Sequence, residues 1–316
     1  MVEMMHIRVE PYSSQQKNIW DEMIARSRNG VFLFFRDYME YHVDRFQDAS
    51  LLFFEGNDLL AVLPANRNGD QVVSHGGLTF GGVISQHNLG ASAMLELFDV
   101  LREWLHGQGV RSLLYKPVPH IYHRMPAEED LYALFRSGAH LVRRDLSSTL
   151  DMTCRSPKEH GRQNQLKRGK RTFVVRESRD YGAFMDLVSS VLATKYNVEP
   201  THSKQEMELL SGLFPQNIRL YGAYRGEQLC AGVLIYESTN VAHAQYIAGD
   251  DEAKREGALE CVFAELLERR YATTRYFEWG ISTEQAGRWL NTGLVQNKES
   301  YGARGGVYDL YELDLA

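Results

Sequence analysis

The stretch IRLYGAYRGEQLCAGVLIYESTNVAHAQYIAG, residues 218–249, decides the fold. Its apolar residues form three runs of strand length, 218–224, 228–236 and 241–248, and the turn residues 225–227 separate the first two. The middle run is apolar at nearly every position, which predicts a strand that is buried on both faces. We therefore expect this run to be a central strand of its sheet.

A helix and a further strand follow these runs. Apolar residues recur with helical spacing over 257–271, and 276–279 has the pattern of a strand. The same order of strands, helix and strand occurs earlier in the chain. The earlier copy comprises 51–55, 59–65, 91–105 and 111–115. In 91–105 the helical spacing of Met94, Phe98, Leu101 and Leu105, widened by Leu97 and Trp104, predicts one apolar face. Two such copies predict an α/β (α+β) protein with two similar domains.

Length and composition agree with this arrangement. The chain has 316 residues, and at ~150 residues per domain this length suggests two domains. Apolar residues make up 44% and charged residues 24%, which is ordinary globular usage and excludes a disordered chain. Residues 151–171 are polar and basic with little apolar periodicity, so we predict domains at 1–155 and 156–316. The net charge of −6 argues against a protein that coats DNA.

Cysteine usage and hydropathy suggest a cytoplasmic protein. The three cysteines form no CxxC motif, which argues against a disulfide scaffold and a structural zinc site. No stretch reaches the ~20 apolar residues that cross a bilayer, so we expect no membrane insertion. His120 and His123 have the spacing of two metal ligands on a helix, but neighbouring prolines favour a loop. We expect no metal.

A candidate cofactor-binding segment begins where the third strand ends. Gly249 follows that strand, Gly257 and Ala258 open the next predicted helix, and Lys254 and Arg255 lie between them. Free N–H groups at a helix start favour a phosphate there, and the two cations would add to this attraction. Four neighbouring acidic residues would repel a pyrophosphate, however, so an ordinary acidic helix start remains the alternative.

A run of cations is the second candidate binding segment. Arg162, Lys167, Arg168, Lys170 and Arg171 fall within ten residues of a chain that is acidic as a whole. Such a cluster can hold the phosphates of a nucleotide, of a lipid-linked sugar or of tRNA. A solvated linker surface would have the same composition. Arg168 and Arg171 are our candidate substrate contacts in this run.

The late stretch 278–304 holds the candidate catalytic residues. Glu278 ends a predicted strand beside a glycine, where a carboxylate can accept a proton from an attacking amine. Lys298 can stabilise negative charge on an oxyanion or a phosphate, and Tyr301 follows it closely. Asn291 and Arg304 are candidate substrate contacts. Helix capping and surface ion pairs of Lys298 with nearby glutamates are the alternative.

The segment LNTGLVQNKESYGAR, residues 290–304, resembles the late motif of the GNAT-like acyltransferases that are related to the Fem-type peptidoglycan aminoacyltransferases. Residues 115–135, 143–150 and 161–171 resemble an uncharacterised bacterial branch of the same group. The resemblance implies two tandem GNAT-like domains, each a mixed and mainly antiparallel sheet flanked by helices. It also implies that the last strand, about 307–315, packs back on the first domain.

The resemblance further implies transfer of an acyl group to an amine. The donor in such proteins is an acyl-CoA such as acetyl-CoA, or an aminoacyl-tRNA, and the acceptor is a small molecule or a cell-envelope precursor. The motif match assigns to Lys298 the handling of negative charge near the reaction centre. Residues 255–258 only approximate the pyrophosphate loop of classical members, and no long heptad segment is present to form a tRNA-contacting arm. A ligand-binding protein that keeps the fold without catalysis is the alternative.

Overall fold

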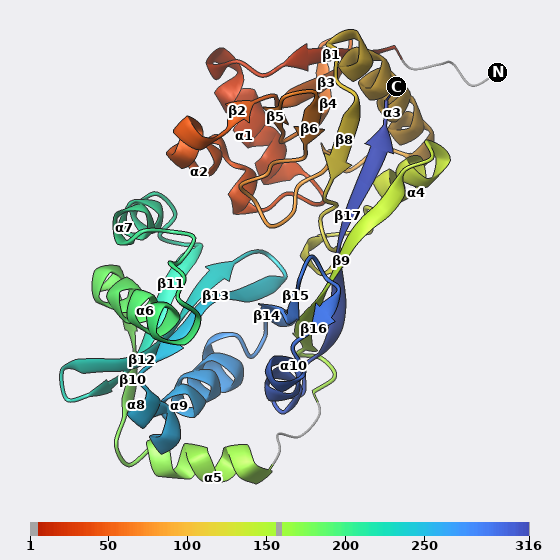
Figure 1. Ribbon diagram of the computed structural model, residues 1–316. Helices are drawn as coiled ribbons and strands as arrows, with labels where there is room; N and C mark the ends of the chain where they lie inside the picture. Colours follow the sequence, from red (N-terminus) through yellow and green to blue (C-terminus); the bar gives the residue numbers. More distant parts are fainter. Residues whose placement is uncertain (1–5, 156–159, 316) are drawn as a thin grey trace. The chain divides into compact units, whose positions relative to one another are not determined.

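The computed structural model describes residues 6–155 and 160–315, which form two compact units. Unit 1 contains the described residues of 1–145, 285–288 and 307–316, and unit 2 contains those of 146–284 and 289–306. The chain passes from one unit into the other within β9 (His140–Asp151) and again within β17 (Arg304–Asp314) (Figure 1). Each unit is described by itself below.

Unit 1 combines short strands with four helices. Its strands are β1 (Ile7–Pro11), β2 (Gln47–Asp48), β3 (Leu51–Glu55), β4 (Asp58–Leu63), β5 (Asn66–Asn68), β6 (Gln71–Val73), β7 (Ile84–Ser85) and β8 (Ser112–Tyr115). Its helices are α1 (Lys17–Arg26), α2 (Arg36–Met39), α3 (Ala91–Gly107) and α4 (Glu129–Arg136). β1, β3, β4 and β7 form one antiparallel sheet, while β8 lies between β6 and the C-terminal half of β17.

The core of unit 1 lies under helix α3. The helix buries one apolar face, which includes Leu97, Phe98, Leu101 and Leu105, against the strands. This face was predicted from the spacing of the same residues. Burying side chains of this size contributes roughly 1.5–3 kcal/mol each, so the helix is held mainly by its packing.

Unit 2 has a larger sheet. Its strands are β10 (Val174–Ser178), β11 (Ile218–Arg225), β12 (Gln228–Glu237), β13 (Val241–Gly249), β14 (Tyr276–Ile281), β15 (Thr283–Glu284) and β16 (Trp289–Leu290). Its helices are α5 (His160–Gly169), α6 (Tyr181–Tyr196), α7 (Lys204–Leu213), α8 (Asp251–Glu256), α9 (Ala258–Glu265) and α10 (Thr292–Glu299). In unit 2 the sheet contains the strand order β10-β11-β12-β13-β14-β9.

The predicted central strand is confirmed. β12 lies between β11 and β13, and its residues from Cys230 to Tyr236 are all buried. One face of the sheet packs on α9 through residues such as Val233, Val262 and Phe277. The predicted helix 257–271 is observed as α9, which ends at Glu265, and a wider helical turn that continues it to Arg270.

One strand pair in this sheet differs from its neighbours. β13 and β14 run parallel, whereas β10–β11, β11–β12, β12–β13 and β14–β9 are antiparallel. The parallel pairing joins only residues 241–243 to residues 276–278. Beyond these residues β13 continues to Gly249 and β14 to Ile281 without pairing to each other in the described part of the chain. We call this point, where the two strands part, the strand fork.

The observed fold confirms the predicted class, which is mixed α/β with mainly antiparallel sheets flanked by helices. Across residues 6–155 and 160–315, every helix is too short or too polar to span a lipid bilayer.

Candidate functional site

Glu278 lies at the strand fork. It is the last residue of β14 that pairs with β13, and its partner in the register is His243. On the other side of β14, Glu278 pairs with Thr149 of β9. Its side chain has no exposed surface. The carboxylate of Glu278 therefore lies at the strand fork, but in the interior of unit 2.

The buried carboxylate of Glu278 is held by three donors. The Ser147 hydroxyl and the Gly280 N–H donate to Oε1, the latter at 2.8 Å, and Nδ1 of His243 contacts Oε2. Burial raises the pKa of Glu278, but the attraction of His243 and these hydrogen bonds outweigh burial and hold the pKa below its usual range. Glu278 is therefore ionised at neutral pH.

His243 is the residue of the site that the sequence reasoning missed. It is a single polar residue between two buried alanines of β13 and pairs with Glu278 in the register. Its side chain keeps 16% of its surface exposed. The only sequence signal was a histidine within an apolar strand, and its significance depends on the pairing of β13 with β14.

Lys298 comes from α10 and is 4% exposed. Its Nζ donates to the Gly280 and Ile281 carbonyls, each at 2.8 Å, and to the Ser282 hydroxyl at 2.9 Å. All three ammonium donors are thus used by the last two residues of β14 and the residue that follows them. Burial lowers the pKa of Lys298 to about 8, against an opposing attraction from Glu278. The structure therefore places Lys298 and Glu278 near each other, with Lys298 anchoring the exit of β14.

Tyr301 lies in the core of unit 2. Its ring stacks on Trp279 with centroids 5.6 Å apart, and the guanidinium carbon of Arg162 lies 4.3 Å from the centre of the ring. Arg162 also donates to Glu260 at 2.7 Å and to the Tyr301 hydroxyl at 3.2 Å. In the described structure, the side chain of Tyr301 therefore joins α5 to the end of α10.

We predict that Arg162→Lys lowers the free energy of unfolding by about 2 kcal/mol. Lysine cannot reproduce the planar fork that binds Glu260 and covers the ring of Tyr301. Urea unfolding measures this loss. Arg168→Lys, an exposed change in the same helix, is the matched control. If both changes lower the free energy of unfolding by the same small amount, the contacts of Arg162 with Glu260 and Tyr301 do not stabilise the protein.

The candidate cofactor residues surround the short helix α8. Gly249 packs against β12, Arg255 is exposed, and Lys254 lies 3.7 Å from the Asp251 carboxylate. The Asp250 side chain accepts the Ala253 N–H and so caps α8.

Gly257 and Ala258 form the start of α9, and helix α5 covers this start. A Cβ at Gly257 would lie 2.3 Å from the Gln165 carbonyl oxygen, and a Cβ at Gly169 would lie 2.4 Å from the Gly257 carbonyl oxygen. Ala258 has no exposed surface. Two glycines thus let the backbones of α5 and α9 touch (Figure 1).

These contacts bear on acetyl-CoA, one of the two donors that the resemblance to GNAT-like acyltransferases implies. A pyrophosphate at the start of α9 needs free backbone N–H groups and open space. The backbone of α5 occupies this space, and the Glu260 carboxylate, which is paired with Arg162, already lies in the first turn of α9. The residues present do not fit a CoA pyrophosphate at this position.

The remaining candidate substrate residues lie at the surface or at element ends. Asn291 caps α10 by accepting the Leu294 N–H at 3.0 Å and donates to Glu284 at 2.9 Å. Arg304 is exposed at the start of β17. Arg168 and Arg171 are exposed on α5 and just after it. The structure brings Glu278 and Lys298 together and leaves these four residues outside that group.

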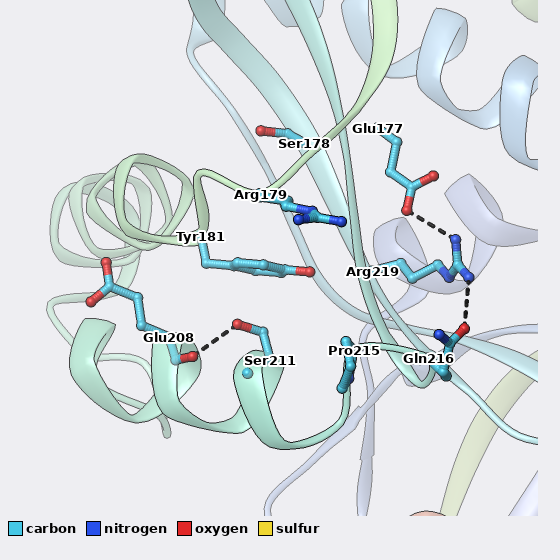
Figure 2. Close-up of a pocket in the computed structure, with 10 residues that line it drawn as sticks. Glu177, Ser178, Arg179, Tyr181, Glu208, Ser211, Pro215, Gln216 and Arg219 are labelled. Carbon is cyan, nitrogen blue, oxygen red and sulfur yellow. Dashed lines mark hydrogen bonds and ion pairs between the residues drawn. The ribbon is translucent and has the colours of Figure 1, made fainter.

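A surface pocket of about 580 Å³ lies elsewhere in unit 2 (Figure 2). The end of β10, the start of β11, helix α6 and helix α7 line it. Arg219 donates to Glu177 at 2.9 Å along one side, and Arg179 and Tyr181 lie along another. None of the predicted site residues lines this pocket. Within the ranges that the structure describes, no cluster of three or more His, Cys, Asp or Glu side chains is arranged to hold a metal ion.

Comparison with known proteins shows which domain and which folds the chain is similar to. Residues 159–286 match the model of an acetyltransferase (GNAT) domain. No curated protein matches the chain in sequence. Among solved structures, one titled FemX is 10% identical with a TM-score of 0.66, and the match covers 96% of each chain.

Two further structures extend this likeness. The C-terminal domain of a putative lysylphosphatidylglycerol synthetase from Agrobacterium fabrum is 12% identical with a TM-score of 0.59, covering 95% of this chain and 92% of that one. A tandem GNAT protein from the clavulanic acid biosynthesis pathway is 11% identical with a TM-score of 0.50, covering 98% and 99%. Residues 159–286 therefore match a GNAT acetyltransferase domain, and the fold of the chain as a whole is similar to those of the FemX structure and the tandem GNAT protein.

Proposed function

We propose that the chain is an N-acyltransferase whose reaction takes place at the strand fork of unit 2. The observation that carries this proposal is the divergence of β13 and β14 beside the ionised, buried Glu278. Past the fork, residues 244–249 of β13 have no strand partner on the side of β14 in the described structure. Their backbone N–H and C=O groups on that side are available to an extended, amide-containing donor or acceptor.

The covered start of α9 favours a donor other than CoA. A donor that is an aminoacyl ester of RNA needs no pyrophosphate site, and it carries many phosphates that attract cations. Lys167, Arg168, Lys170 and Arg171 are exposed on and beside α5, and no carboxylate pairs with them among the described residues. We therefore propose aminoacyl-tRNA as the donor, and the amine of a small molecule or cell-envelope precursor as the acceptor.

Thermal-shift measurements test the donor. Aminoacyl-tRNA at a concentration well above its Kd is expected to raise the melting temperature, because a ligand of the native state stabilises it by mass action. Acetyl-CoA at millimolar concentration is expected to leave the melting temperature unchanged. Stabilisation by acetyl-CoA would contradict the proposed donor, and stabilisation by neither would favour a protein without this activity.

Replacing Lys167, Arg168, Lys170 and Arg171 together by alanine is expected to weaken tRNA binding at least tenfold at 0.15 M salt. The dependence of the affinity on salt should also become shallower, because fewer phosphate contacts release fewer counterions. Filter binding across a salt series measures both effects.

The matched control removes four surface cations that are paired with carboxylates elsewhere in the chain. They are Arg111, Arg176, Lys195 and Lys204. This control changes the net charge of the protein by the same amount. If both variants lose the same affinity for tRNA, the loss comes from overall charge, and that result would contradict a binding surface on α5.

A further inference from the structure

We infer that Nε2 of His243 accepts the proton of the attacking amine, and that Glu278 acts as a positioning residue that orients the imidazole. The inference rests on the proposed acyl transfer and names its catalytic base. It reassigns the role predicted for Glu278, whose carboxylate has no exposed surface and cannot itself reach an acceptor.

The hydrogen bonds at Glu278 fix which ring nitrogen carries the proton. An ionised carboxylate accepts hydrogen bonds and donates none. Nδ1 of His243 must therefore be the donor to Glu278, and in the neutral ring Nε2 then carries the lone pair. A carboxylate that holds a histidine in one tautomer is the arrangement by which a histidine serves as a general base.

The surroundings of the ring leave part of the imidazole exposed. His243 is the last residue of β13 that pairs with β14, and 16% of its side chain is exposed. Gly280 has a positive φ of 76°, and a Cβ built there would lie 3.6 Å from Cε1 of the imidazole. The absence of a side chain at Gly280 therefore leaves that edge of the ring uncrowded.

The charged groups around the dyad have separate tasks. Glu278 faces His243 from β14, and Lys298 comes from α10 and uses its three donors on Gly280, Ile281 and Ser282. Lys298 thus fixes the segment that follows Glu278 and has no donor left for a reacting group. On β12, the register partner of His243 is Tyr236.

The reaction step balances with a donor that is an acyl ester. The lone pair of the amine forms a bond to the acyl carbon, and the carbon–oxygen bond of the ester breaks. The electron pair of the broken bond leaves with the ester oxygen. Nε2 of His243 takes the proton that nitrogen loses, and the protonated imidazole can return it to the leaving oxygen. A base placed in this way contributes typically 10²–10⁴-fold to the rate.

Glu278→Gln is the most informative variant, because it preserves the shape of the side chain and reverses the direction of its hydrogen bond with His243. Ser147 and the Gly280 N–H both donate to Oε1, so the amide oxygen of glutamine would stay on that side. Its NH₂ group would then face Nδ1 of His243 and donate to it. The ring would have to carry its proton on Nε2, where it can no longer accept one.

Two measurements test the inference on the full chain. The first is ¹⁵N NMR of the histidine side chains, which needs no substrate. In the wild type, under alkaline conditions where imidazoles are neutral, we expect Nδ1 of His243 to be protonated and Nε2 unprotonated. In Glu278→Gln we expect the opposite tautomer. The same tautomer in both proteins would overturn the inference.

The second measurement is acyl transfer from aminoacyl-tRNA to glycinamide as the amine probe. His243→Gln and Glu278→Gln are each expected to lower kcat at least 100-fold while KM for the donor changes less than threefold. His140→Gln, an exposed histidine of unit 1, is the control. If the wild type transfers and His243→Gln keeps more than a third of kcat, the inference fails; if the wild type transfers nothing, the proposed function fails and the NMR result still decides the tautomer.

Discussion

Gly257→Ala is expected to lower the free energy of unfolding by about 3 kcal/mol. The residue has a positive φ of 93°, which costs a residue with a Cβ about 1 kcal/mol. The new methyl group would also lie 2.3 Å from the Gln165 carbonyl, a backbone atom that cannot turn aside, and overpacking of this kind costs a further ~1–3 kcal/mol. Urea unfolding measures the total.

The second effect of Gly257→Ala is the displacement of α5. Hydrogen exchange in residues 160–169 should become faster, because their contact with α9 is lost. Gly161→Ala is the matched control, since a Cβ there meets nothing within 4 Å in the same helix. We expect this control to be neutral or slightly stabilising.

A double variant tests whether the two glycines form one contact. Gly169→Ala crowds the same backbone from the side of α5, so the combined loss should fall short of the sum by about 1 kcal/mol. Gly257→Ala could lower the free energy of unfolding only by the cost of its positive φ and leave hydrogen exchange in α5 unchanged. That result would show that α5 does not pack tightly against Gly257.

Local patterns in the sequence were sufficient for the fold. The apolar positions of residues 228–236 predicted a central strand, and the structure confirms it in β12. The spacing from Met94 to Leu105 predicted the buried face of α3. Both predictions succeed because burial imposes a period of two or 3.6 residues on neighbouring positions.

The site depends on contacts between distant residues, and periodicity carries no information about these. His243 and Glu278 meet only because β13 and β14 are parallel and in one particular register. The sequence identified Glu278 as a carboxylate at a strand end, but its burial follows from the Ser147 hydroxyl and the β9 strand beside it. The burial of Glu278 and the tautomer of His243 therefore depend on how these strands pair.

Gly257, at the start of α9, is a second position whose role the local sequence could not decide. Gly257 is compatible with a phosphate-binding turn and equally with close helix packing. The residues around Gly257 are consistent with both possibilities. The partner that decides between them is the carbonyl of Gln165 in α5.

Lys298→Met is expected to have an effect on stability that changes with pH. At pH 7 the variant leaves the Gly280 and Ile281 carbonyls and the Ser282 hydroxyl without their donor, and it also removes a buried charge. Unpaired acceptors cost ~1–3 kcal/mol each and the buried charge about 3 kcal/mol, so the net loss at pH 7 is about 2 kcal/mol. Lys167→Met, an exposed change, should cost almost nothing.

Above pH 8 the difference between the wild type and Lys298→Met should widen. The native pKa of Lys298 is about 8 and the ordinary value is 10.5, so between these values the unfolded chain binds more protons than the native one. The free energy of unfolding of the wild type therefore rises with pH relative to the variant, by about 3 kcal/mol in all. Urea unfolding at pH 7, 9 and 10.5 measures the difference directly. A difference that stays constant would mean that water reaches the ammonium group, and the β14 exit would then need another anchor to hold Glu278 against His243.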